Sequence, residues 1–307
     1  MKNNQITFSQ FLSVSFLSSL CSILFISRTP SVFVIISAVA ALFLNFIVFT
    51  FYKGQNRKIL FPLSFIYLSF YCVYVVVKFS DYMNKALSYG PACLIIAVLL
   101  AFTFFCTVKG FEAVARASTV IAVFVIAGLV YMLVCTFTNI RFNITADIPA
   151  RFNSSAVLLF PSALYIVCYD NIISIKPKLY IAYSALLTAV ILYFLIISSG
   201  VKSLYPIQYL PAISKIGVFK GSDCILLSIL TVSCMFSVTS STAVLFKACK
   251  HNYLTNAVFI GTILIISVTI EFFGLFNYLE EYIFVPFSAA LITAFIVFSL
   301  IKRGRNV

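Results

Sequence analysis

The chain has 307 residues, of which 63% are hydrophobic and only 9% are charged, and its formal net charge at pH 7 is +13. A soluble domain is about 45–50% apolar and about 25% charged, so this composition excludes an ordinary soluble enzyme, a disordered protein and a disulfide scaffold. The basic residues are spread between apolar runs rather than gathered in one patch, which argues against nucleic-acid binding.

Apolar runs bounded by charged residues, Pro and Asn predict an all-α polytopic membrane protein, because each transmembrane helix needs about 20 apolar residues. Ten helices are expected, covering about 8–27, 32–52, 59–79, 91–108, 117–139, 155–169, 178–199, 223–246, 255–273 and 282–301. The longest polar stretches, about 140–154 and 200–222, are too short to fold alone. Residues 1–307 are therefore expected to form a single transmembrane, permease-like domain in the lipid bilayer.

The distribution of Lys and Arg predicts the orientation of the helices. If the N-terminus is cytoplasmic, the loops on the cytoplasmic side carry most of the basic residues, and only Glu112 and Asp170 among the acids. An even number of helices then places the C-terminus on the same side. We expect a multi-pass protein with both termini cytoplasmic.

Ten helices divide into two halves of five, a first repeat over about 6–139 and a second over about 155–301. Because each half has an odd number of spans, the second half is inverted in the membrane relative to the first. This inverted repeat is the LeuT-like plan of many secondary transporters. In that plan the first helix of each half is broken at the midplane, where the substrate binds. Pro161 predicts the break in helix 6, and the Ser-rich face of helix 1 indicates that helix 1 is the second broken helix.

No catalytic motif is present, and an enzyme is not expected. The nine Cys contain no CxxC pair, so neither a metal site nor a cofactor is predicted. Polar groups at membrane depth are the informative residues, because each costs free energy unless it is paired or faces a cavity. The hydroxyls of helices 1 and 8 allow two interpretations, close helix packing or the lining of a polar ligand pocket.

Three stretches in this order resemble the motifs of the spore germination permease family, which lies within the amino acid–polyamine–organocation transporter superfamily. Residues 6–10 resemble its I-[ST]-x-x-Q start, residues 110–116 its G-[IF]-E-x-[IV]-A-R loop, and residues 205–223 its Y-P, I-G-x-F and Asp segment. An architectural role is expected for the motif residues, in which glycine and proline shape turns and the Glu–Arg pair steadies a helix start. These residues are Gln10, Gly110, Glu112, Arg116, Tyr205, Pro206, Gly217 and Asp223.

The family resemblance implies the membrane-embedded B subunit of a nutrient-germinant receptor, in a spore inner membrane or cell membrane. It implies partners, a membrane-anchored A subunit and a lipoprotein C subunit, and a ligand that is an amino acid or another small polar nutrient. It places this ligand between helices 1, 3, 6 and 8, with helix termini holding a carboxylate. The residues expected there are Ser18, Ser22, Tyr71, Tyr74, Pro161, Ser162, Tyr165, Ser233 and Ser237.

Two other functions stay open from the sequence. One is an amino acid transporter that works by alternating access, although every acid is placed in a loop or at a helix end, where it cannot couple an ion at the midplane. The other is a degenerate scaffold subunit that binds nothing. The chain departs from the family pattern at Cys21-Ser22, which replaces Gly-Thr, and at Ala212, which replaces Arg.

Overall fold

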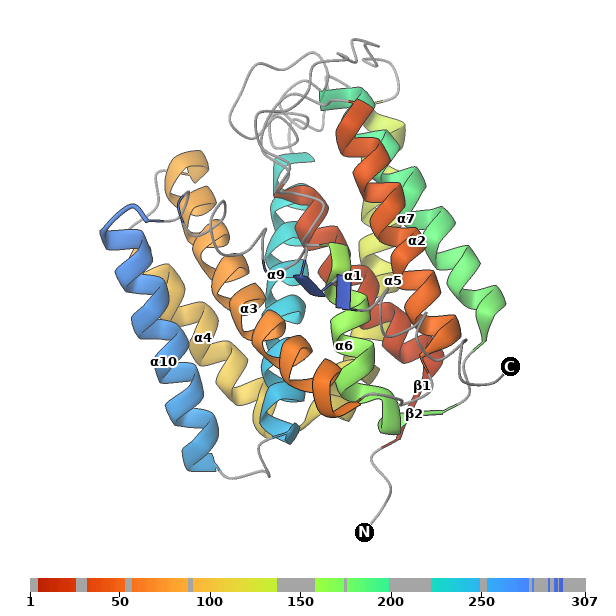
Figure 1. Cartoon of the computed structure of the whole chain (residues 1–307). Helices are drawn as coiled ribbons and strands as arrows, with labels where there is room; N and C mark the ends of the chain where they lie inside the picture. The colour runs from red at the N-terminus through yellow and green to blue at the C-terminus, as the bar shows by residue number, and fades with distance from the viewer. Residues whose placement is uncertain are drawn as a thin grey trace.

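Nine α-helices make up almost all of the part of the chain that the computed structural model describes (Figure 1). The described residues are 5–25, 32–52, 57–87, 91–136, 158–173, 176–198, 222–248 and 253–275, with single positions between 278 and 294. The helices are α1 (Phe8–Leu24), α2 (Val32–Phe51), α3 (Arg57–Leu87), α4 (Ala92–Val108), α5 (Phe111–Thr136), α6 (Phe160–Cys168), α7 (Pro177–Ser198), α9 (Ser222–Ala248) and α10 (Tyr253–Phe272).

The first nine predicted helices are confirmed, and the tenth, about 282–301, lies almost wholly outside the described residues. Two boundaries differ. Helix α3 continues to Leu87, so Lys78 lies within it and is only 5% exposed. Helix α5 begins at Phe111 rather than near 117, because Gly110, with φ of 85°, ends the turn after α4. Most of the predicted loop at 110–116 therefore belongs to the first turns of α5, which begins at Phe111.

Of the two expected helix breaks, the one in helix 1 is not found. Helix α1 is continuous from Phe8 to Leu24. Helix α6 is short, with nine residues, but Pro161 lies in its first turn rather than in its middle. A proline is well tolerated there, because the N–H that it lacks has no partner within the helix anyway. Pro161 therefore lies at the start of the described α6, and residues 155–157, which belong to the first part of predicted helix 6, lie outside the described residues.

Four of the described helices are long and apolar enough to span a membrane, namely α3, α5, α9 and α10. Large apolar side chains lie exposed on the outer helices, including Phe105 at 71% and Phe124 at 72%. In water such surfaces are costly, whereas lipid tails solvate them. These apolar helices fit an integral membrane protein.

Helices α1 and α9 form the centre of the bundle (Figure 1). Every residue of α1 is buried except Ser9, Gln10 and Ser13. Helix α9 packs against α1, α3, α4 and α5. Because these two helices are largely buried, they pack against neighbours on most sides and bring their serines into the interior.

A two-residue parallel pairing joins the start of α1 to the end of α6. Strand β1 (Ile6–Thr7) pairs with β2 (Ile172–Ile173), which follows a short 3-10 turn, η3 (Tyr169–Asn171). At the same place, the Nζ atom of Lys247 near the end of α9 donates to Oδ1 of Asn171 over 2.8 Å. The chain entering α1 and the chains leaving α6 and α9 therefore meet at one end of the bundle.

Candidate functional site

Four helices converge on the side chain of Tyr71, which is fully buried on α3. Its hydroxyl donates to the backbone carbonyl of Ser18 on α1 over 3.1 Å. It also lies 2.6 Å from Oγ of Ser237 on α9 and 3.3 Å from Oγ of Ser22. From α6, the ring of Phe160 approaches the Tyr71 ring to 4.5 Å between centroids. We call Ser18, Ser22, Tyr71 and Ser237 the Tyr71 cluster.

The direction of each hydrogen bond in the cluster follows from the number of protons available. Ser22 donates to the Ser18 carbonyl of the preceding helical turn over 3.0 Å. The Tyr71 phenol has one proton, which it gives to the same carbonyl. Ser237 must therefore donate to the phenol oxygen. The cluster thus ties α3 to α1 and α3 to α9 through one hydroxyl.

Small side chains explain why these helices approach each other so closely. Serines on α1 and α9 leave room for the neighbouring backbone. One turn away, Sγ of Cys21 on α1 and Sγ of Cys234 on α9 are 3.4 Å apart, and both are fully buried. The pair of contacts sets α1 and α9 antiparallel, with Ser18 opposite Ser237 and Cys21 opposite Cys234.

Ser18 takes part in the cluster through its backbone carbonyl, and its hydroxyl is one of several buried hydroxyls on α1 and α9 that have no hydrogen-bond partner within the described residues. They are Oγ of Ser15 and Ser18 on α1 and Oγ of Ser233 on α9. Ser233 lies one turn from Ser237 along α9. Buried polar groups in folded proteins are nearly always paired, so each exception needs an explanation. These three hydroxyls are unused hydrogen-bonding groups on the two central helices.

The structure separates Ser162 from the Tyr71 cluster. Its hydroxyl donates to Oδ1 of Asn45 on α2, and Nδ2 of Asn45 donates to the carbonyl of Leu158 over 2.9 Å. Asn45 is fully buried and was missed in the sequence, although a lone amide in the middle of an apolar span is a signal for a buried partner. Ser162 and Asn45 join α6 to α2.

Tyr165 and Tyr74 also lie apart from the cluster's hydrogen bonds. The Tyr165 ring packs against Phe49, Tyr169, Phe11 and Tyr52 at 4.7–6.1 Å between centroids. Its hydroxyl is buried without a partner among the described residues. Tyr74 is 2% exposed, and Nζ of Lys78 lies 5.9 Å from its ring centroid.

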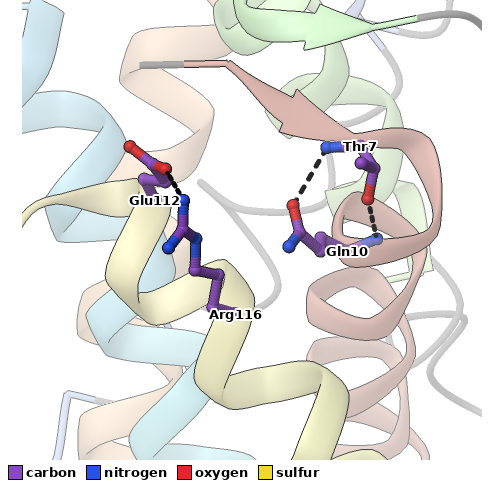
Figure 2. Close-up of polar contacts among 4 residues, drawn as sticks. All are labelled: Thr7, Gln10, Glu112 and Arg116. Atoms are coloured by element: carbon purple, nitrogen blue, oxygen red, sulfur yellow. Dashed lines mark hydrogen bonds and ion pairs between the residues drawn. The ribbon is translucent and has the colours of Figure 1, made fainter. Parts of the chain in front are cut away.

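Two of the three motif segments lie at the start of neighbouring helices (Figure 2). Thr7 and Gln10 form a capping box, in which the Thr7 N–H donates to Oε1 of Gln10 over 3.0 Å and the Gln10 N–H to Oγ1 of Thr7 over 3.4 Å. On α5, Arg116 donates to Glu112 in the expected i,i+4 ion pair. These contacts are architectural, because each satisfies the first turn of its own helix.

The third motif segment lies mostly outside the described residues. This applies to Tyr205, Pro206 and Gly217, whereas Asp223 belongs to the first turn of α9. In the described part of the chain, no three His, Cys, Asp or Glu side chains gather where they could hold a metal ion.

No protein-family model matches the chain, and no curated protein does.

Proposed function

We propose that the chain is a permease-like membrane subunit that binds a small polar nutrient at the Tyr71 cluster. The observation that carries the proposal is that three buried hydroxyls on α1 and α9, those of Ser15, Ser18 and Ser233, have no partner among the described residues, on the two helices that contact Tyr71. A buried hydroxyl that lacks a hydrogen bond costs about 1–3 kcal/mol. A polar ligand between α1 and α9 would recover this free energy.

An amino acid suits the donors and acceptors of this place. Ammonium groups need acceptors, and because the Ser18 carbonyl already receives two donors, the acceptors left for them are the unpaired hydroxyl oxygens, such as that of Ser15. Carboxylates need donors, which the hydroxyls of Ser18 and Ser233 can supply. The buried aromatic ring of Phe160 beside Tyr71 would form an apolar wall that selects the side chain of the ligand.

The order and spacing of the motifs in the sequence support the finer proposal, a germinant-receptor B subunit with a ten-helix, LeuT-like inverted repeat. The same plan requires α1 and α6 to run antiparallel, which the β1–β2 pairing supports. Both termini are proposed to be cytoplasmic, from the positions of Lys and Arg. In this proposal, the nutrient shifts a conformational equilibrium, and the change reaches A and C subunits in the same membrane.

Binding of labelled amino acids to the full chain in lipid nanodiscs tests the site. Ser18→Ala and Ser233→Ala remove hydroxyls that make no hydrogen bond in the described structure, so the fold should tolerate both. Loss of one ligand hydrogen bond, about 1 kcal/mol, should weaken binding about fivefold. The matched control is Ser267→Ala, which removes an equally buried and unpaired hydroxyl on α10 and should leave binding unchanged. Wild-type affinity in both test variants would contradict the proposed site.

Two further assays separate the receptor from the other functions. Uptake of the same labelled ligand into proteoliposomes would identify a transporter. Release of dipicolinic acid from spores lacking the gene, measured over a panel of amino acids and sugars, tests the receptor. Binding without uptake, together with loss of the response to one nutrient class, supports a receptor. A chain that binds nothing in the panel while deletion leaves every response unchanged would contradict it and leave the scaffold.

A further inference from the structure

A cavity lies away from the Tyr71 cluster, between α4, α5 and the C-terminal half of α9. Its volume is about 210 Å³, and none of its lining residues belongs to the cluster. Phe102 of α4 and Phe236 of α9 form apolar walls, and Ala113 and Ala117 of α5 form another. The two alanines are one helical turn apart, so their small side chains leave a gap that neighbouring helices do not fill.

The cavity opens toward the surface that faces lipid. Both alanines are exposed, and Phe102 is 43% exposed. The adjoining face of α4 continues with Phe105, which is 71% exposed. An acyl chain of the membrane can therefore reach the cavity from the side without crossing polar groups.

Polar groups are confined to one end of this cavity. Lys109, which follows the last residue of α4, is exposed and makes no ion pair within the described part of the chain. The neighbouring acid, Glu112, is bound to Arg116. Thr239 is only 3% exposed, and its Oγ1 atom has no hydrogen-bond partner among the described residues.

The cavity thus changes from cationic to apolar along α4. Lys109 comes three residues after Cys106, an axial separation of about 4.5 Å. It comes seven residues after Phe102, an axial separation of about 10 Å. A ligand that fits this order has an anionic group, then a hydrogen-bond acceptor within a few ångströms, then a hydrocarbon chain. Phospholipids have this order in their phosphate, ester carbonyl and acyl chain.

We propose that the cavity is a binding site for an anionic phospholipid of the surrounding membrane. Lys109 binds the phosphate, the Thr239 hydroxyl donates to an ester carbonyl, and one acyl chain packs along Phe102 and Phe236. Basic pockets between transmembrane helices bind anionic headgroups in this way, and a Lys near the bilayer surface attracts them. The lipid would brace α5 against α4 and α9, and the proposal does not depend on the nutrient site.

Native mass spectrometry of the full chain tests the proposal. The chain is purified in detergent in the presence of equal amounts of phosphatidylglycerol and phosphatidylethanolamine that carry the same acyl chains. We expect one retained phosphatidylglycerol in preference to phosphatidylethanolamine. Lys109→Gln should lower the retained phosphatidylglycerol about fivefold, the factor that corresponds to about 1 kcal/mol for one Lys near an anionic surface. Ala117→Leu should fill the cavity and lower retention of both lipids.

Matched variants and a competitor complete the test. Lys178→Gln and Ala185→Leu change an exposed lysine and an exposed alanine of α7, and both should retain lipid as the wild type does. An unchanged lipid preference in Lys109→Gln would overturn the proposal, whether or not Ala117→Leu folds. Displacement of the lipid by an equal concentration of oleate would also overturn it, because a free fatty acid carries a carboxylate and a chain but no ester for Thr239.

Discussion

Removal of the Tyr71 hydroxyl is the most informative perturbation of the central helices. Tyr71→Phe keeps the ring and its contact with Phe160 but deletes the group that joins α3 to α1 and α3 to α9. It also leaves the hydroxyl of Ser237 without its acceptor. Ser237 can turn back to a carbonyl of its own helix, so part of the loss is recovered.

The expected destabilisation follows from two broken interhelical hydrogen bonds. Such bonds in membrane proteins contribute about 0.6 kcal/mol on average and about 1.7 kcal/mol at most. The bond to the Ser18 carbonyl is 3.1 Å long, and the contact with Ser237 is only 2.6 Å, which places the second toward the strong end. Tyr71→Phe should therefore lower the free energy of unfolding by about 1–3 kcal/mol.

Unfolding of the full chain by dodecyl sulfate in mixed micelles measures this free energy. A double-mutant cycle with Ser237→Ala should give a coupling energy of about 0.6–1.7 kcal/mol between the two hydroxyls. The matched control is Ser233→Ala on the same helix face, an equally buried serine whose hydroxyl has no partner in the described structure. It should show no coupling to Tyr71→Phe. A coupling energy with Ser237 that is zero within error would refute the proposed hydrogen bond.

Three other predictions concern contacts that hold the bundle together. Asn45→Ala should lower the free energy of unfolding by about 1–3 kcal/mol, because it leaves the buried Ser162 hydroxyl without an acceptor; the same unfolding assay measures the change. Gly110→Ala should cost about 1–2 kcal/mol, because φ at this position is 85°. A membrane-permeant oxidant should link Cys21 to Cys234, whose sulfur atoms are 3.4 Å apart, and peptide mapping by mass spectrometry should detect the cross-link.

Each of these predictions has a control of opposite or null outcome. Thr50→Val removes an exposed hydroxyl that bonds only to its own helix, and its effect should stay within about 0.5 kcal/mol. Gly261→Ala lies in the interior of α10 with open space at the Cβ position, so it should stabilise the helix by about 0.5–1 kcal/mol. The fully buried Cys72 on α3 should stay reduced. Stabilisation by Gly110→Ala would contradict the argument from the positive φ at this position. If Cys21 stays reduced under the oxidant, that result would contradict the placement of Cys21 opposite Cys234 in the antiparallel packing of α1 and α9.

Hydropathy along the chain was by itself enough to predict a helical membrane protein and the positions of the nine described helices. An apolar run of about 20 residues predicts a span from its own composition, without reference to neighbours. The same local logic explains why α5 begins earlier than predicted. Glu112 and Arg116 were assigned to a loop because they are charged, whereas their mutual ion pair lets both remain on α5.

Part of the candidate site could also be predicted. Serines on the first and eighth predicted helices and tyrosines on the third were expected to face the interior, and Ser18, Ser22, Tyr71 and Ser237 do meet there. Their binding of a ligand stays a prediction.

Only the tertiary structure decided which buried polar group meets which. It placed Ser162 against Asn45 rather than in the Tyr71 cluster, and it placed Thr239 in a cavity with Lys109. The physical reason is the near-uniform hydrophobicity of these helices. A helix of a soluble protein has one apolar face that sets its rotation, but α1 is buried on nearly all faces. Its orientation therefore depends on the shapes and hydrogen bonds of the neighbouring helices, which no single stretch of sequence contains.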